Sequence, residues 1–430
     1  MKITALLDVN VVAFEEEDEV SVLLELEAPA APAELARPQA SLQVVLDRSG
    51  SMSGSPLEGA KKALAALVRR LEPGDNFGLV TFDDSAQVVV PAGPVTDKES
   101  IVRRIESIDA GGTTDLSAGY LRGLREVRRV ARAAGTVLII SDGHVNAGIQ
   151  SVDDFASITS KAYANGIVTS TLGFGQGYDE TLLSAIARSG SGNHMFAENP
   201  DAAAAAIAGE VDGLLNKVVQ ALSLTVRFEP AVLFLRLYND LPAQHIGDGA
   251  VMIELGDLYG QEARKLLLKF KVPAMAALGL AKIAALELTY IELPGLIEHT
   301  ATLPIHVNVV PGDEAAGRVP HPTVQSEVLF QEAQDAKRQA SEAFERGDLE
   351  VGKRLLGETK ARLSQSLDVA PELLKPEIRA ELDEVVRMDA MTYDVGTAYM
   401  SKMSRDSYHL MNRKRGRTVH PDSHTAGDPK

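Results

Sequence analysis

The spacing of apolar residues along the chain divides it into regions with different patterns. Residues 1–40 contain short runs in which apolar and polar residues alternate, such as ITALLDVNVVAF and VSVLLELEA. Alternation with a period of two is typical of strands that bury one face. The stretch Pro29–Pro38 that follows is rich in proline and alanine, and it predicts a linker.

Over residues 41–216 the pattern changes to continuous apolar runs separated by amphipathic segments. LQVVL, NFGLVTF, TVLIIS and IVTSTLGF are rich in Val, Ile and Leu, as expected for strands that are buried on both faces. Between them, apolar residues at three- and four-residue steps predict helices over 56–71, 97–107, 116–134, 152–165, 179–189 and 201–216. This alternation predicts a doubly wound α/β domain with a mostly parallel, Rossmann-like sheet.

The helical pattern largely disappears over residues 217–312. Successive runs from LSLTVRF to TATLPIHVNVV read as strands of an antiparallel β-sandwich. Two strands within residues 1–40 would bury too little area to be stable alone. We therefore expect them to join this sandwich, with the α/β domain inserted between strands of one β domain.

Helices are predicted again over residues 320–405. Apolar residues recur at three- and four-residue steps from Leu329 to Phe344 and from Leu349 to Leu367, with a Gly-Asp break between the two segments. This pattern predicts a helical hairpin, followed by a third helix over roughly 376–404. Residues 406–430 are polar, with a basic run, and we expect this tail to be disordered.

Charge and composition narrow the classes of function. The formal net charge of −17 would repel a nucleic acid backbone, and the lack of cysteine excludes disulfides and thiolate metal sites. No charge-free run reaches the roughly 18 apolar residues of a membrane helix. The N-terminal segment reads as a strand and not as a signal peptide, so we expect a cytoplasmic protein. The glycine-containing segments 54–62 and 173–177 lack the spacing of phosphate-binding and dinucleotide-binding loops, so no nucleotide is expected.

The candidate chemistry lies where predicted strands end. The run LQVVL ends at an aspartate that is followed by serines at steps of two, and TVLIIS also ends at an aspartate. In doubly wound sheets, ligands bind beyond the carboxyl ends of the strands, where the topology switches. Carboxylate and hydroxyl oxygens suit Mg²⁺, with Mn²⁺ and Ca²⁺ as alternatives, and they do not suit Zn²⁺ or Cu²⁺. The candidate ligands are Asp47, Ser49, Ser51 and Asp142, and the segment 111–119 between strands offers Thr113 and Thr114 as further hydroxyls.

These residues also carry a resemblance to a known family. The segment Asp47-Arg48-Ser49-Gly50-Ser51, together with Thr114 and Ser141-Asp142-Gly143, resembles the metal-ion-dependent adhesion site of von Willebrand factor A domains. The resemblance covers residues 41–216. Gly119, five residues after Thr114, matches the usual spacing of the family's threonine, and Thr113 is the alternative.

The resemblance implies metal-mediated protein binding, in which an acidic residue of a partner protein completes the coordination. The wider layout is similar to that of inter-alpha-trypsin inhibitor heavy chains and of bacterial proteins that contain an A domain. We therefore expect a scaffold or interaction module and not an enzyme. The alternatives are a non-catalytic subunit of an ATP-driven metal-insertion or remodelling complex, and a structural assembly protein. His144 is a candidate base, but it is better explained as a histidine of a surface loop.

Overall fold

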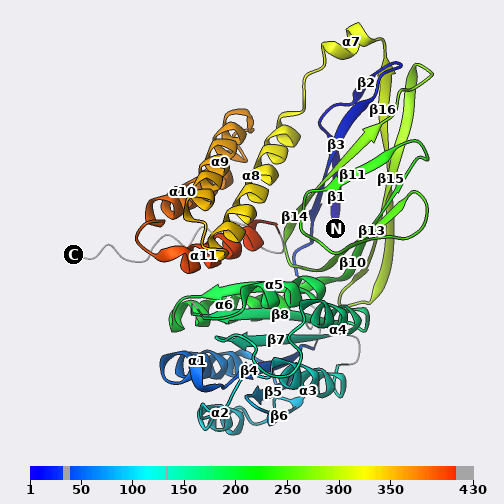
Figure 1. The fold of residues 1–430 in the computed structure, drawn as a ribbon. Helices are drawn as coiled ribbons and strands as arrows, with labels where there is room; N and C mark the ends of the chain where they lie inside the picture. Colours follow the sequence, from blue (N-terminus) through cyan, green and yellow to red (C-terminus); the bar gives the residue numbers. More distant parts are fainter. Residues whose placement is uncertain (32–38, 132–133, 176, 413–430) are drawn as a thin grey trace.

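The computed structural model describes residues 1–31, 39–131, 134–175 and 177–412 (Figure 1). Most of the predicted linker Pro29–Pro38, and the predicted tail beyond residue 412, lie outside the described residues. The remainder forms an α/β unit, a pair of β-sheets and a C-terminal group of helices.

The α/β unit is built on one sheet with the strand order β6-β5-β4-β7-β8-β9. Only the β5–β6 pair is antiparallel, and all other pairs in this sheet are parallel. Every residue of β4, β5, β7 and β8 is buried, as their continuous apolar runs predict. The strands are β4 (Ser41–Asp47), β5 (Asn76–Phe82), β6 (Ala86–Pro94), β7 (Gly135–Ser141), β8 (Ile167–Phe174) and β9 (Ser191–Ala197).

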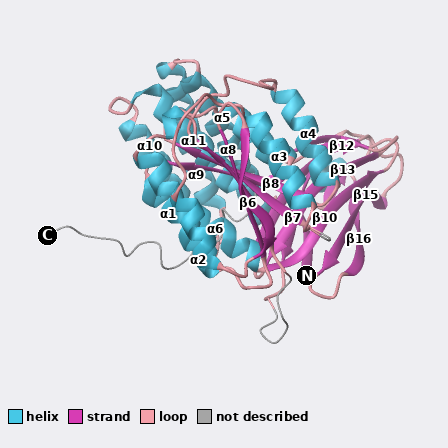
Figure 2. Ribbon diagram, turned by 90° about the horizontal axis from the view of Figure 1, so that it is seen from below, coloured by secondary structure: helices cyan, strands magenta, loops and turns pink. Residues whose placement is uncertain are grey.

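Helices cover both faces of this sheet, and each face has its own hydrophobic cluster (Figure 2). α1, α2 and α6 pack on one face, whereas α3, α4 and α5 pack on the other. The doubly wound α/β prediction is therefore confirmed. The helices are α1 (Ser55–Arg70), α2 (Lys98–Glu106), α3 (Leu116–Arg128), α4 (Val152–Ala164), α5 (Glu180–Ser189) and α6 (Pro200–Leu215).

One of these helices is shorter than predicted. The expected helix 116–134 ends at Arg128, and β7 begins at Gly135. The close approach of this helix to the sheet explains Gly119, since a Cβ there would lie 2.6 Å from the Phe82 ring.

The topology of the sheet reverses at β4. This strand pairs with β5 on one side and with β7 on the other, both in parallel. The carboxyl ends of β4 and β7 are therefore neighbours at the switch point, where doubly wound folds form their ligand crevice.

Strands from both ends of the chain form two further sheets, with the orders β1-β3-β14-β11 and β12-β13-β10-β15-β16-β2. Both sheets contribute to one hydrophobic cluster, so they pack as two layers around a shared core. β3 pairs with β14, which joins the chain before the α/β unit to the chain after it. The strands are β1 (Lys2–Leu7), β2 (Val11–Ala13), β3 (Asp18–Glu27), β10 (Lys217–Phe228), β11 (Leu233–Leu237), β12 (Ala243–His245), β13 (Ala250–Tyr259), β14 (Ala263–Val272), β15 (Gly279–Glu292) and β16 (Ile297–Val310).

The N-terminal strand differs from its prediction. The run over residues 3–14 forms β1 and β2, which belong to different sheets. The chain passes from one sheet to the other at Asp8. The Oδ1 atom of this residue accepts hydrogen bonds from the Val9 N–H at 2.7 Å and the Ser21 N–H at 2.9 Å. β2 then pairs in parallel with β16, so the sandwich is not purely antiparallel.

The C-terminal helices include the predicted hairpin, α8 (Pro322–Glu345) and α9 (Leu349–Val369), after a short α7 (Gly312–Ala316). The predicted single helix over 376–404 is wrong, because the chain forms α10 (Lys375–Met391) and α11 (Gly396–Asn412). Gly396 has a φ of +72°, which ends helical continuity. Residues 406–412, expected in a disordered tail, belong to α11. Within the described part of the chain, none of the helices combines the length and the hydropathy of a membrane span.

Candidate metal centre

Asp47 is the last residue of β4, and its side chain is buried. Its Oδ1 accepts a hydrogen bond from the Ser49 N–H at 2.8 Å. Its Oδ2 accepts one from the Ser141 hydroxyl at 2.6 Å. The carboxylate is therefore fixed between the ends of two neighbouring parallel strands.

A chain of hydroxyls joins this carboxylate to the second one. The Oγ atoms of Ser49 and Ser51 lie 3.1 Å apart, and the Ser51 hydroxyl donates to Asp142 Oδ1 at 2.8 Å. Asp142 follows the last residue of β7, and it is 9% exposed. The structure thus brings together Asp47, Ser49, Ser51 and Asp142, which the sequence places in two separate segments.

Thr114 joins the same group. A Cβ on Gly143 would lie 3.2 Å from Ser51 Oγ and 3.7 Å from Thr114 Oγ1, so both hydroxyls face the glycine that follows Asp142. Thr114 is 3% exposed, and its backbone N–H donates to Asn146 Oδ1 at 2.9 Å. Asn146 was not predicted as part of the centre, because an asparagine in a polar loop gives no signal of such a role.

The adjacent Thr113 points elsewhere. It is exposed, and both its backbone N–H and its hydroxyl donate to Asp84 Oδ1, the former at 2.7 Å. The geometry therefore favours Thr114 over Thr113 as the threonine of the centre.

Backbone contacts hold the three loops together. The Gly111 N–H donates to the Arg48 carbonyl at 2.7 Å, and the Gly50 N–H donates to the Gly112 carbonyl at 3.2 Å. Gly112 has a φ of +78°, and a Cβ there would lie 2.8 Å from Asp83 Cβ. The loop that carries Thr114 is thus fixed against the loop that follows Asp47.

The centre concentrates negative charge. Burial raises the pKa of Asp47. Burial, with a further contribution from the charge of Asp47, raises the pKa of Asp142 to about 6. Within the described residues no lysine, arginine or histidine forms an ion pair with either carboxylate, and the neighbouring Arg48 pairs with Asp83 at 2.6 Å instead.

Such a group fits a divalent cation. Partly desolvated carboxylates without a cationic partner are costly, and a bound cation relieves that cost. No cluster of three or more His, Asp or Glu side chains suited to a metal occurs among the described residues. The centre does not need one, because its remaining oxygen donors are the hydroxyls of serine and threonine.

The His144 side chain is 73% exposed, and its Nδ1 lies 3.8 Å from Asp179 Oδ2, as expected for a histidine of a surface loop.

Comparison with known proteins identifies the α/β unit. Residues 42–208 match the family model of the von Willebrand factor type A domain. The chain is 32% identical over 164 residues to the uncharacterized protein sll0103 of Synechocystis sp., covering 38% of this chain and 39% of that protein. It is 26% identical over 234 residues to the human inter-alpha-trypsin inhibitor heavy chain H3, covering 51% of this chain and 25% of that protein. The chain therefore spans less than half the length of these relatives.

Solved structures show the same fold over nearly the whole chain. A von Willebrand factor type A protein from Catenulispora acidiphila has a TM-score of 0.71 at 15% identity, covering 91% of this chain and 96% of that one. The ArnB paralog VWA2 from Sulfolobus acidocaldarius has a TM-score of 0.66 at 16% identity, and the match covers 97% of this chain and 99% of that one. At these identities the likeness concerns the fold alone. The chain is thus a protein that carries a von Willebrand factor type A domain, over residues 42–208.

Proposed function

We propose that this chain binds a partner protein through a divalent cation, and that the cation is Mg²⁺. The observation that carries the proposal is the pair of buried carboxylates, Asp47 and Asp142, which are linked by hydroxyls and form no ion pair with a lysine, arginine or histidine among the described residues. Domains of the von Willebrand factor A type are commonly metal-dependent modules for protein–protein interaction, which supports the same role here.

The proposed ligands divide into charged and neutral groups. The carboxylates of Asp47 and Asp142 supply the negative charge, and hydroxyls supply neutral oxygen. Mg²⁺ keeps several water ligands in such sites. Neutral hydroxyls leave the bound cation electrophilic, so that it can accept a carboxylate from another protein. The proposed set is Asp47, Ser49, Ser51, Thr114 and Asp142.

We propose binding and not catalysis. The groups that form the centre are carboxylates and hydroxyls that are hydrogen-bonded to one another. A general base must reach the proton that it removes. The His144 side chain is 73% exposed, and its Nδ1 lies 3.8 Å from Asp179 Oδ2.

The two adjacent threonines provide a matched test. Thr114→Ala removes a buried hydroxyl that faces the centre, whereas Thr113→Ala removes an exposed hydroxyl that donates to Asp84. Mg²⁺ affinity is measured by isothermal titration for both variants. Capture of proteins from an extract of the producing cells is measured with Mg²⁺ and with EDTA.

We expect Thr114→Ala to weaken Mg²⁺ binding about tenfold or more, the scale for loss of a group that ligates or orients the ligands of a metal. Thr113→Ala should behave like the wild type. Capture should require Mg²⁺ and should fall with Thr114→Ala. Equal Mg²⁺ affinity in both variants, or full capture in EDTA, would contradict the proposal.

A further inference from the structure

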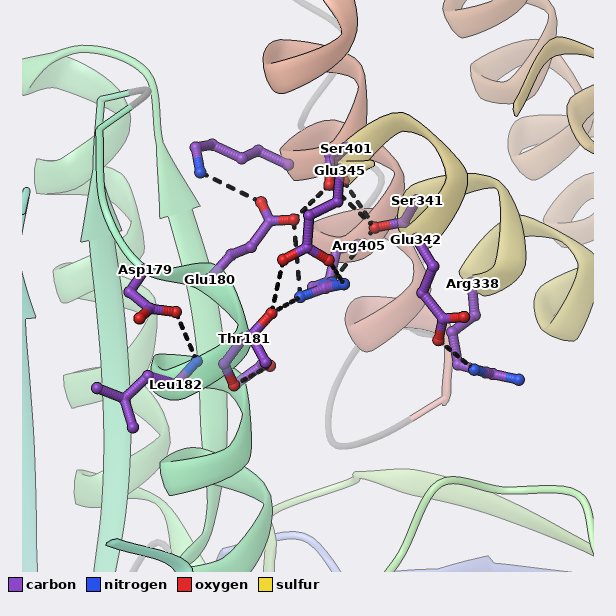
Figure 3. A network of polar contacts seen from close by, with 12 residues as sticks. Asp179, Glu180, Thr181, Leu182, Arg338, Ser341, Glu342, Glu345, Ser401 and Arg405 are labelled. Carbon is purple, nitrogen blue, oxygen red and sulfur yellow. Dashed lines mark hydrogen bonds and ion pairs between the residues drawn. The ribbon is translucent and has the colours of Figure 1, made fainter. Parts of the chain in front are cut away.

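Helix α11 is anchored on the α/β unit by buried polar contacts. Lys402 Nζ donates to the Tyr178 carbonyl at 3.0 Å and lies 3.2 Å from Glu180 Oε2. The Lys402 and Glu180 side chains are 7% and 5% exposed. Figure 3 shows Ser401 and Arg405 of α11 directed at the same Glu180 carboxylate, at the start of α5.

Further contacts extend this junction toward β9. The Phe196 N–H donates to Asp406 Oδ1 at 3.0 Å, and the Tyr399 hydroxyl donates to Glu198 Oε2 at 3.0 Å. α11 therefore contacts the carboxyl-terminal part of β9 and the residue that follows it. Because β4, β7, β8 and β9 run in parallel, the junction and the metal centre both lie at the carboxyl ends of the strands.

The junction combines these polar contacts with an edge contact between the Phe196 and Tyr399 rings, whose centroids lie 6.3 Å apart. The hydrophobic cluster of the C-terminal helices contains no residue of the α/β unit, and the two clusters of that unit contain no residue of the helices. Polar interfaces between parts of one chain resemble transient protein interfaces and permit relative motion. Separation of α11 from the α/β unit would thus leave each of these hydrophobic clusters intact.

The segment that α11 holds also contacts the metal centre. A Cβ on Gly177 would lie 3.1 Å from the Asp142 carbonyl oxygen, so the backbone at Gly177 lies against the backbone of Asp142. The next residue is Tyr178, whose carbonyl accepts the hydrogen bond from Lys402. Lys402 Nζ also lies 4.2 Å from the centre of the Tyr178 ring, in a cation–π contact. A continuous set of contacts therefore runs from Lys402 through Tyr178 and Gly177 to Asp142.

We propose that α11 regulates the metal centre, because its docking holds residues 177–179 against Asp142 and thereby sets the affinity for the cation. This inference rests on the proposed function of the centre. By thermodynamic linkage, a ligand that is bound more tightly in the docked form must also strengthen docking. A partner that competes for α11 would lower the affinity of the metal centre.

The test is Mg²⁺ titration of the full chain carrying Lys402→Met, with Lys360→Met as the control for loss of an ion-paired lysine elsewhere in the helical region. Methionine keeps the apolar stem near Tyr178 and removes the ion pair with Glu180. Lys360 pairs with Asp389 at 3.1 Å within the helical region. Glu180→Gln attacks the same contact from the α/β side, in case Lys402→Met does not fold. Hydrogen exchange over 396–412 reports whether α11 is docked.

We expect Lys402→Met and Glu180→Gln to lower Mg²⁺ affinity about tenfold, within the range of typical coupling between sites. Exchange over 396–412 should become faster in both variants, and Lys360→Met should match the wild type in both measurements. Unchanged Mg²⁺ affinity despite faster exchange would refute the regulation while leaving the proposed function intact. Unchanged exchange in both variants would equally refute it, because the contact would then not hold α11. Failure of the wild type to bind Mg²⁺ would instead refute the proposed function.

Discussion

Replacing Asp142 with asparagine should make the metal-free protein more stable at neutral pH. Asparagine keeps an oxygen that can accept the hydrogen bond from Ser51, and it removes a charge that burial and Asp47 disfavour. The pKa of Asp142 is raised from 3.8 to about 6 in the folded protein. At about 1.4 kcal/mol per pKa unit, ionisation of this group costs the fold about 3 kcal/mol, which is the upper limit of the expected gain.

The gain should depend on pH in a defined direction. Because the pKa of Asp142 is higher in the folded state, folding is favoured when this group is protonated. The cost of its charge is absent below pH 3.8, grows as the pH rises toward about 6, and is complete above that. Asp142→Asn should therefore stabilise the metal-free protein fully at pH 8, and the gain should disappear near pH 4.

The assay is hydrogen exchange of the β7 amides in EDTA at several pH values, because this strand reports on the stability of the α/β unit itself. The exposed Asp109 provides a control, and Asp109→Asn should change stability by less than about 0.5 kcal/mol. In Mg²⁺ at 1,000 times Kd the order should reverse, because the wild type gains about 4.1 kcal/mol of binding free energy that the variant lacks, which exceeds the upper limit of about 3 kcal/mol. A loss of stability at pH 8 in EDTA, or a gain that does not vary with pH, would refute the reasoning.

Two further predictions concern the fold. The fragment 39–217 should fold alone because it contains the complete sheet and both helix layers, whereas 218–312 should aggregate because β14 loses its neighbour β3. Light scattering and thermal unfolding test both fragments, and a soluble, cooperatively folded 218–312 would argue against the insertion. In the helical region, Lys337→Met should lower the free energy of unfolding by about 3–5 kcal/mol, since it removes the ion-pair partner of the buried Glu381 carboxylate. A decrease of less than about 1 kcal/mol in the free energy of unfolding would show that Glu381 is compensated in another way.

Local patterns predicted the α/β unit and most of the candidate centre. A buried parallel strand has a continuous apolar sequence, so the ends of β4 and β7 are visible in the sequence, and with them Asp47 and Asp142. The sequence pattern does not decide whether Thr113 or Thr114 belongs to the centre. The Thr114 hydroxyl faces Gly143 and the Thr113 hydroxyl donates to Asp84, and both of these neighbours lie in segments distant in the sequence.

The errors of prediction lie where tertiary contacts override a continuous pattern. The apolar alternation of residues 3–14 shows no break, yet Asp8 redirects the chain by binding the backbone of Ser21. The helical spacing over 376–404 continues through Gly396, whose positive φ separates two helices. The docking of α11 joins Lys402 to a glutamate 222 residues earlier in the chain, and no local pattern reports such a pair.

The central claim is that Asp47 and Asp142 form a divalent metal centre. Isothermal titration of Mg²⁺ into the full-length wild type and into Asp47→Ala tests it most directly. Asp47 lies at the end of β4 and outside the hydrophobic clusters, so the variant should remain folded, which circular dichroism in EDTA would check. We predict saturable binding at one site in the wild type and none in Asp47→Ala. Equal binding of Mg²⁺ by a folded Asp47→Ala variant, or no binding by the wild type, would contradict the account.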